Sequence, residues 1–410
     1  MSSTKLTTDN IRSLDASKLS GALPSLDGSN LTHLGDVEVS DGNPLPTSNK
    51  SLGQIWMNHS SGESYMCTDA TVGSNVWTNI GTSGTGDIFK PPFSFQGTHG
   101  GYMCGGEYPH SGYGVKTHKF IFANSTQQNN LSDLIYIGGN NMTCTKDTSA
   151  SWIYAKGGPG YMYLPAQMQR WSMTSGISTQ AVGNLTGGES IEPCEFSTSS
   201  HGYYVGGGNV SGTAEQGNFD TDRFAFASSV SRQSFGTLQT SFCQATATQD
   251  GEDYGYCLGN VHIYGPSTAF HATANQKINL QSATTSAYIT SASYYIMRAG
   301  GTSSTTHGYS HGGHWYNGPA GGNITDAVNR FQFSTGSGAT EVGSLSHSMH
   351  DGHGLSSTSY GFSAGGIGGS ANPAPLGSAV YRYAYSSSVS STSWGTLKDG
   401  GNTYGGSAEN

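Results

Sequence analysis

Short apolar runs alternate with clusters of glycine and small polar residues along nearly the whole chain. Between Leu52 and Gly81, apolar and polar positions alternate around an "SSGE" turn and continue in "NVWTNI", which predicts a hairpin followed by a third strand. After a linker at residues 81–92, "GTSGTGDIFKPP", about four strand-like segments recur in each stretch of about fifty residues. Apolar residues at helical spacing are scarce. The pattern therefore predicts an all-β protein.

Three sequence markers repeat with one period after the linker. The first is an aromatic residue three positions before a glycine, at intervals of 52, 49, 53, 53 and 53 residues: Tyr102, Tyr154, Tyr203, Tyr256, Tyr309 and Phe362. The second is a basic residue before alternating apolar positions: Lys119, Arg170, Arg223, Lys277, Arg330 and Arg382. The third is a Gly-x-Leu motif that begins at Val182, Phe235, Val342 and Trp394. Three markers with a common period indicate true structural repeats.

Six repeats of about fifty residues predict a six-bladed β-propeller from about residue 97 to residue 410. A four-stranded sheet buries both faces only between neighbouring sheets, so such units are expected to pack around a ring. The double glycine, the aromatic strand after the loop and Trp394 near the fourth strand resemble kelch repeats, a likeness that implies a fold and says little about function. Either "GGNTYGG" (residues 400–406) or "FSFQ" (residues 93–96) is expected to supply the closing strand. The predicted domains are a fibrous segment (1–35), a small β-hairpin module with its linker (36–88) and the propeller (89–410).

Composition argues against several classes of protein. Charged residues make up 10% of the chain, the net charge is -9, and no run of Lys or Arg occurs, so nucleic acid is not an expected partner. The N-terminus "MSSTKLTTDN" lacks the apolar core of a signal peptide, and no apolar stretch approaches membrane-spanning length. The sequence therefore predicts neither a signal peptide nor membrane insertion. Six dispersed cysteines without a CxxC pair predict reduced, buried thiols and no cofactor.

Residues that recur in every repeat are interpreted as scaffold. This applies to the basic markers, expected to pair with a carboxylate or a carbonyl, and to the histidines before the aromatic marker: His99, His201 and His307. Trp56, Tyr65 and Trp77 have rings that suit sugar stacking, but a module of about thirty residues is expected to use them as its core.

The fifth repeat is rich in histidine, and five of these residues lie near Asp351: His311, His314, His347, His350 and His353. Imidazoles and carboxylates suit zinc, iron or nickel, and the candidate ligands are His311, His314 and His350. Strand geometry sends residues i and i+3 to opposite faces, so neither histidine triplet is a ready ligand set. The prediction is therefore polar loop histidines and no metal.

The loop after the double glycine differs in length and sequence in each repeat, and six such loops are expected to line one face of the propeller. Aromatic and small polar residues in these loops suit stacking and hydrogen bonding to sugars. Self-packing of the loops is the alternative. The candidate ligand-binding residues are Tyr108, Tyr113, Tyr161, Tyr163, Phe219, Tyr264, His314, Trp315 and Tyr316.

The first 35 residues contain a short repeat, "LDASKL" at Leu14 and "LDGSNL" at Leu26. Too few apolar side chains are present for one copy to fold alone, so self-association is expected, with a flexible leader as the alternative. The predicted attachment residues are Leu14, Leu19, Leu23, Leu26 and Leu31.

This leader and the module after it resemble the N-terminal parts of bacteriophage tail-fibre proteins. The resemblance covers about the first 85 residues and implies a trimeric virion protein, made in the host cytoplasm, whose N-terminus binds other tail or baseplate proteins. We therefore expect a non-enzymatic receptor-binding appendage that recognises host surface polysaccharide. A capsid or tail decoration protein and a carbohydrate-active enzyme are the alternatives.

Overall fold

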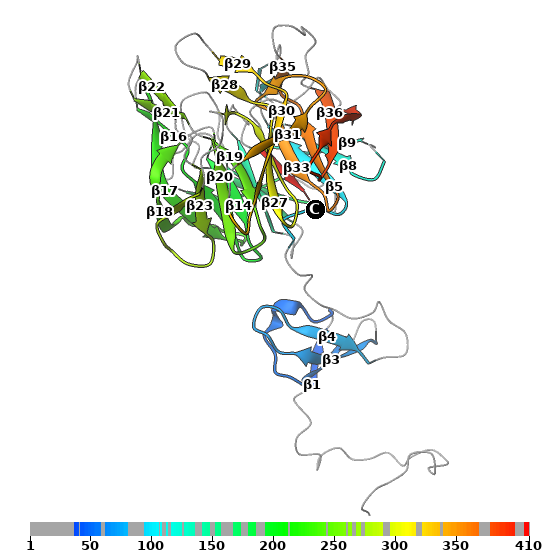
Figure 1. Cartoon of the computed structure of the whole chain (residues 1–410). Coiled ribbons are helices and arrows are strands. Elements are labelled where there is room, and N and C mark those ends of the chain that lie inside the picture. Colours follow the sequence, from blue (N-terminus) through cyan, green and yellow to red (C-terminus); the bar gives the residue numbers. More distant parts are fainter. Residues whose placement is uncertain are drawn as a thin grey trace, which may run out of the picture. The chain divides into compact units, whose positions relative to one another are not determined.

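The computed structural model divides into two units, Met1–Lys90 and Pro91–Asn410 (Figure 1). The division lies two residues from the predicted boundary at 88/89. The structure describes residues 37–40, 42–58, 62–80, 94–105, 107–108, 112–113, 116–124, 127–135, 142–147, 152–156, 167–173, 179–185, 193–211, 214–242, 245–259, 261–264, 268–271, 275–289, 296–316, 322–336, 339–368, 378–397 and 406–409. The predicted attachment leucines, Tyr161, Tyr163 and Cys243 lie outside these residues. No helix among the described residues is long and apolar enough to cross a membrane.

The first unit contains one four-stranded sheet in the order β1-β2-β3-β4. Its strands are β1 (Val37–Ser40), β2 (Ile55–Asn58), β3 (Ser64–Asp69) and β4 (Val76–Asn79), and a 3-10 helix covers Pro46–Ser48. The β2–β3 hairpin and the third strand β4 are antiparallel, as the alternating pattern predicts. Sequence analysis missed β1, which pairs parallel with β2.

The aromatic residues of the module form its core. Trp56, Tyr65 and Trp77 are buried together with Cys67, and the two tryptophan rings meet edge to face at 5.9 Å. Both indole N–H groups donate to backbone carbonyls: Trp56 donates to Gly42 at 2.8 Å, and Trp77 donates to Leu45 at 3.2 Å. Their rings are therefore not available for stacking on sugars.

The second unit confirms the all-β prediction, with six sheets built on a four-stranded pattern. Each of the following lists runs from one edge of the sheet to the other. Sheet one is β39 (Gly406–Glu409), β5 (Gly100–Cys104), β8 (Lys116–Ile121) and β9 (Gln127–Asp133). Sheet two is β10 (Thr143–Asp147), β11 (Trp152–Lys156), β12 (Gln167–Ser172) and β13 (Gln180–Asn184). Sheet three is β14 (Cys194–Ser197), β15 (His201–Val205), β17 (Ala214–Ala225) and β18 (Gln233–Phe242). Sheet four is β19 (Thr246–Gln249), β20 (Tyr254–Leu258), β23 (Gln276–Asn279) and β24 (Ala287–Tyr288). Sheet five is β26 (Gly300–Ser303), β27 (His307–His311), β30 (Ala327–Gln332) and β31 (Thr340–Ser344), with β37 (Val389–Ser390) added at its edge. Sheet six is β33 (His353–Ser356), β34 (Tyr360–Ala364), β36 (Ala379–Ala384) and β38 (Thr392–Thr396).

The first strands of these sheets, here called the innermost strands, contact one another in a closed cycle. β10 contacts β14, β14 contacts β19, β19 contacts β26, β26 contacts β33, β33 contacts β39, and β39 contacts β10. The six sheets therefore surround a common axis. In sheets two to six the strands follow one another in chain order from the innermost strand outward, and the aromatic and basic markers lie on the second and third strands of every sheet.

The chain end supplies the strand that closes this cycle. β39 pairs antiparallel with β5, so the last described strand joins the first strand of the second unit in one sheet. Closure leaves no free strand edge at this seam, which protects the protein from edge-to-edge association. The predicted "GGNTYGG" segment overlaps β39 only at Gly406, and the competing "FSFQ" segment has a different role, described below.

The aromatic and basic markers are direct partners in every sheet. The basic residue lies opposite the aromatic residue in the register of the second and third strands, as Tyr154 does opposite Arg170. The cations lie over aromatic rings: the guanidinium of Arg382 is 3.4 Å from the ring centroid of Trp394, and the ammonium of Lys277 is 3.5 Å from that of Tyr254. The expected pairing with a carboxylate or a carbonyl left out these cation–π contacts. Arg170 and Arg223 also donate to the side-chain carbonyl oxygens of Gln180 and Gln233.

The aromatic marker also joins neighbouring sheets. The hydroxyl of Tyr102 donates to the carbonyl of Met173 at 2.7 Å, and that of Tyr203 donates to Leu280 at 2.6 Å. Tyr154, Tyr256 and Tyr309 make the equivalent contact with the sheet that follows each of them. One side chain thus fills the sheet interface and satisfies a carbonyl of the next sheet.

The glycine markers reflect backbone requirements. Both residues of the Gly312–Gly313 pair have positive φ, 65° and 101°, where the chain leaves β27. In the Gly-x-Leu marker, a Cβ at Gly343 would lie 1.9 Å from the carbonyl oxygen of Val389 on β37, the segment that connects β36 and β38 of sheet six. The periodic glycines therefore mark a sharp turn and a close approach between sheets.

Candidate binding face and axial cavity

The loops that follow the double glycines all leave the second unit on one side. Gly300, the first residue of innermost strand β26, lies opposite His311, the last residue of β27, and the loop from His311 to β30 therefore starts beside it. The same register recurs in sheets two, three and four. We call this side the loop face.

Several loops carry short strands of their own. These strands are β6 (Glu107–Tyr108), β7 (Gly112–Tyr113), β16 (Gly208–Ser211), β21 (Val261–Tyr264), β22 (Thr268–His271), β25 (Ile296–Met297), β28 (His314–Tyr316), β29 (Gly322–Ile324), β32 (Met349–His350) and β35 (Ile367–Gly368). In Figure 1, the β21–β22 and β28–β29 pairs and β35 lie at one end of the second unit, and the C-terminus lies at the other.

The predicted aromatic residues are distributed over this loop face. Tyr108 and Tyr113 lie on the paired strands β6 and β7, and Tyr264 ends β21 opposite Thr268 of β22. Trp315 lies between Ile296 and Asn323 in the small β25-β28-β29 sheet, and the neighbouring Tyr316 lies opposite Gly322.

Phe219 is the candidate with the best-defined surroundings. It lies on the long strand β17, which continues past sheet three to pair with β16 and contacts β21 of the next loop. Its side chain is 45% exposed, an unusual state for a phenylalanine on a strand. A projecting ring beside two hairpins is a suitable surface for stacking on a sugar.

A cluster of polar side chains joins the loops of sheets five and six. The rings of His314 and His350 lie 4.1 Å apart, and Nδ1 of His350 hydrogen-bonds to the carboxylate of Asp351. Arg298 approaches the other carboxylate oxygen at 3.7 Å. Burial, and then the neighbouring His350, lower the pKa of His314 to about 4, so that ring is neutral near pH 7.

His311 is separated from this cluster by its own contact. Its ring is completely buried, with Nδ1 3.0 Å from the hydroxyl of Tyr383, and burial lowers its pKa to about 3. Of the three candidate metal ligands, the structure brings together His314 and His350 but not His311. No group of three or more His, Cys, Asp or Glu side chains among the described residues is arranged to hold a metal ion.

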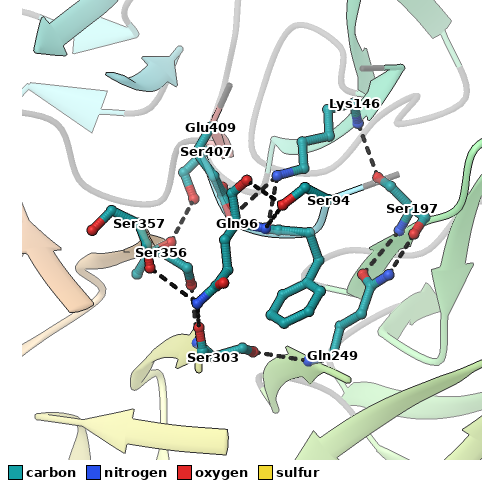
Figure 2. Close-up of polar contacts among 12 residues, drawn as sticks. Ser94, Gln96, Lys146, Ser197, Gln249, Ser303, Ser356, Ser357, Ser407 and Glu409 are labelled. Atoms are coloured by element: carbon teal, nitrogen blue, oxygen red, sulfur yellow. Dashed lines mark hydrogen bonds and ion pairs between the residues drawn. The ribbon is translucent and has the colours of Figure 1, made fainter. Parts of the chain in front are cut away.

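The opposite end of the axis is closed by a cycle of hydrogen bonds between innermost strands (Figure 2). Backbone N–H groups donate to side chains of the next strand: Lys146 to Ser197 at 2.9 Å, Ser197 to Gln249 at 3.2 Å, Gln249 to Ser303 at 3.0 Å and Ser303 to Ser356 at 2.9 Å. The N–H of Ser356 donates to the carboxylate of Glu409, and Nζ of Lys146 lies 3.4 Å from that carboxylate. Six residues, one from each innermost strand, therefore form what we call the closing ring.

The "FSFQ" segment occupies the centre of this ring instead of forming a closing strand. Lys146 donates its ammonium to the carbonyl of Phe95 at 2.7 Å, and the Gln96 amide donates to the carbonyls of Ser303 and Ser357 at 2.9 and 3.0 Å (Figure 2). These residues come directly after the linker, so the chain enters the second unit at the end of the axis away from the loop face.

A cavity of about 220 Å³ lies along the axis, lined by all six innermost strands and by Phe95. It has room for about seven water molecules at about 30 Å³ each. Its three acidic groups all have partners in the scaffold: the backbone N–H of Cys144 donates to Glu195, Glu409 pairs with Lys146, and Asp351 belongs to the cluster with His350 and Arg298. Burial raises the pKa of Glu195 well above its usual value and lowers that of Lys146.

Comparison with known proteins gives the fold class. No protein-family model matches the sequence, and no curated protein matches it. The structure is similar to that of YjhT, with a TM-score of 0.51 and 13% sequence identity over 65% of this chain and 86% of that chain. The second unit has a propeller-type fold. At this level of identity the likeness concerns the fold alone and leaves open what the loop face binds.

Sequence reasoning missed the closing ring, although a signal for it was present. Ser197, Gln249, Ser303 and Ser356 follow one another at intervals of 52, 54 and 53 residues, the same period as the three markers. These residues form a fourth periodic marker, which is difficult to recognise because serine is common throughout the chain. In addition, Gln249, Lys146 and Glu409 stand in place of serine in three of the six innermost strands.

Proposed function

We propose that the chain is a virion appendage protein in which the six sheets are the blades of a six-bladed, kelch-like propeller. Its N-terminus attaches to other tail or baseplate proteins, and its loop face binds polysaccharide on the host cell surface. The observation that carries this proposal is the opposite placement of two features on the second unit. The chain enters through Phe95 and Gln96 at the closing ring, and the variable loops leave at the other end of the axis.

This arrangement suits a tethered adhesin. A protein held at the closing-ring end presents its loops outward, where variation in them leaves the sheet scaffold unchanged. Phe219 supplies an exposed ring, and the neutral ring of His314 supplies a hydrogen-bonding group on β28. Aromatic rings next to uncharged polar groups are suited to neutral sugar surfaces.

We propose adhesion without bond cleavage. Three carboxyl groups line the cavity, and each is engaged by the scaffold. Glu195 accepts from a backbone N–H, Glu409 pairs with Lys146, and Asp351 contacts Arg298 and His350. Glycoside hydrolysis uses a pair of carboxyl groups directed at the sugar. Constant chain length of the polysaccharide during incubation with the protein is the expected result, and shortening of it would support the enzymatic alternative.

The test is a binding measurement on the purified full chain, with polysaccharide extracted from the host envelope as the probe. Phe219→Ala is expected to weaken binding by about 3- to 10-fold, the worth of one aromatic stacking contact. Val72→Ala is the control, because Val72 is 82% exposed and lies in the first unit, outside the loop face. Equal affinities for the wild type and the Phe219 variant would count against this hairpin as the contact site.

A decoration protein without receptor binding gives a different result. In that case the wild-type chain binds no surface polysaccharide of the host, while purified virions lacking the protein adsorb normally. Loss of adsorption with intact particles would support the appendage.

A further inference from the structure

Most of the exposed large apolar side chains among the described residues belong to the small N-terminal module. Eleven large apolar side chains are exposed among the described residues, and seven of them belong to the module, which contributes only residues 37–40, 42–58 and 62–80. These seven are Val37, Val39, Leu45, Leu52, Met57, Val72 and Ile80. An apolar surface concentrated in so small a part of a chain indicates an interaction site.

The strand register places several of these residues on one face of the sheet. Val37 lies opposite Ile55, and Val39 lies opposite Met57, so both pairs project from the same side of β1 and β2. Ile55 in turn lies opposite Met66 of β3. We call the side formed by these five residues the module face.

The other side of the same sheet is already filled. Trp56, Tyr65, Cys67 and Trp77 alternate with the residues of the module face and form the buried core. The module face has no such cover: Val39 is 62% exposed and Met57 is 44% exposed. The sheet therefore has one packed side and one apolar side without a partner among the described residues of the module.

The absence of charge on the module face favours a second copy of the chain as its partner. When two identical faces meet, a charged residue on one chain lies near the same charged residue of the other chain, and the two repel each other. A face without charge avoids this repulsion in a chain with a net charge of -9. The five residues of the module face and the neighbouring Ser64 and Thr78 are all uncharged. A core of four side chains is also small for independent stability, and oligomerisation is a common remedy in modules of this size.

The area of the module face indicates that it does not act alone. Four strands about 4.8 Å apart and four residues long at about 3.3 Å each cover roughly 250 Å². A stable interface buries about 800 Å² per partner. The leucine-rich segment Leu14–Leu31 precedes β1 directly in the sequence, and self-association is predicted for it on independent grounds. Both contacts are near each other along the chain, so we expect both to contribute to the interface.

We propose that the module face packs against the same face of a second copy of this chain. Stacked sheets lie about 10 Å apart, a spacing that suits valine and methionine side chains. The inference does not depend on glycan binding, because no residue of the loop face takes part.

The test measures the mass of the full chain in solution by size-exclusion chromatography with light scattering. The wild type is expected at a multiple of 42.7 kDa. The double variant Val39→Asp/Met57→Asp is expected to weaken association by at least about 100-fold, because it sets like charges against each other in the contact. Val72→Asp is the control, since Val72 is 82% exposed but lies in the turn before β4, away from the module face.

Fluorescence of the buried Trp56 and Trp77 verifies that each variant is folded. If the aspartate variant shows altered fluorescence, Val39→Ser/Met57→Ser replaces it and is read by the same criterion. A wild-type chain that stays at 42.7 kDa at about 100 µM would overturn the proposal. So would an oligomer that survives both double variants and disappears on deletion of residues 1–36.

Discussion

Replacement of Lys146 by methionine removes the positive charge of the closing ring. Lys146 lies at the end of the axis where the chain enters, 3.4 Å from Glu409 on β39 and 2.7 Å from the carbonyl of Phe95. Methionine keeps the length of the side chain, and the backbone N–H that bonds to Ser197 is unaffected. The change therefore removes both contacts of the ammonium, with the closing strand β39 and with the entering chain, and leaves the backbone of β10 intact.

The expected cost follows from burial of the pair. Only 6% of the Lys146 side chain and 15% of the Glu409 side chain are exposed, and removal of one partner of a buried ion pair costs about 3–5 kcal/mol. For Pro91–Asn410, a specific unfolding entropy of about 2.1 cal/mol/K per residue gives roughly 0.7 kcal/mol per kelvin. The melting temperature of the second unit is thus expected to fall by about 4–7 °C.

Thermal unfolding of the wild type, Lys146→Met, Glu409→Gln and the double variant completes a cycle. Glutamine retains an acceptor oxygen for the N–H of Ser356, so Glu409→Gln removes charge and little else. The double variant is expected to be less destabilised than either single variant, because it leaves no unpaired buried charge. A drop below about 1 °C for Lys146→Met, or a double variant that loses the sum of the single effects, would refute the role of the pair in closure.

Three further predictions concern the scaffold of the second unit. Gly343→Ala is expected to lower the free energy of unfolding by about 3 kcal/mol or more through overpacking. Gly251→Ala strains a positive φ but meets no atom within 4 Å, so it is expected to lower the free energy of unfolding by about 1 kcal/mol. Equal losses for the two variants in denaturant titrations would contradict the close approach at Gly343. Arg382→Ala is expected to cost about 1–2 kcal/mol through its lost aromatic contacts, with Arg382→Lys intermediate, and an unchanged denaturation midpoint would contradict this. The folded-state pKa values of His311 and His353, about 3 and about 4, lie below the unfolded value of about 6.5, so their stabilising contribution is complete above pH 6.5 and decreases as the pH falls towards 4. At pH 5.5 this loss is on the order of 1 kcal/mol for each histidine, and denaturant titrations should show a shallower pH dependence when both are replaced by asparagine.

The repeated part of the fold was predictable from the sequence because its constraints recur. The aromatic residue and the opposing cation occur in every sheet, and the glycine of the Gly-x-Leu marker occurs in four of the six repeats, so all three recur at the period of the sheets. Tyr154 and Arg170 illustrate this, because they lie opposite each other in the register of β11 and β12 and are therefore in contact. The partner of the cation was not predictable, because ring and carboxylate alternatives look the same in a one-dimensional pattern.

The parts that occur once were harder to predict. The module strand β1 has only Val37 and Val39 as apolar positions, too few to distinguish a strand from a loop. The separation of His311 from His314 and His350 follows from Tyr383, which lies 72 residues away in the next sheet. Residues this distant meet only through the closed arrangement of sheets, so local spacing carries no information about them.

Binding of the full chain to purified surface polysaccharide of the host tests the central claim most directly. In the decisive variant, short Gly-Ser turns replace the β16–β17 hairpin tip and the β21–β22 hairpin. The control is the module variant Val39→Asp/Met57→Asp, and both are compared in solution at equal chain concentration. The account predicts saturable binding by the wild type and the control, and loss of binding in the hairpin variant at an unchanged melting temperature of the scaffold. Binding that survives replacement of both hairpins, or that disappears only in the module variant, would contradict it.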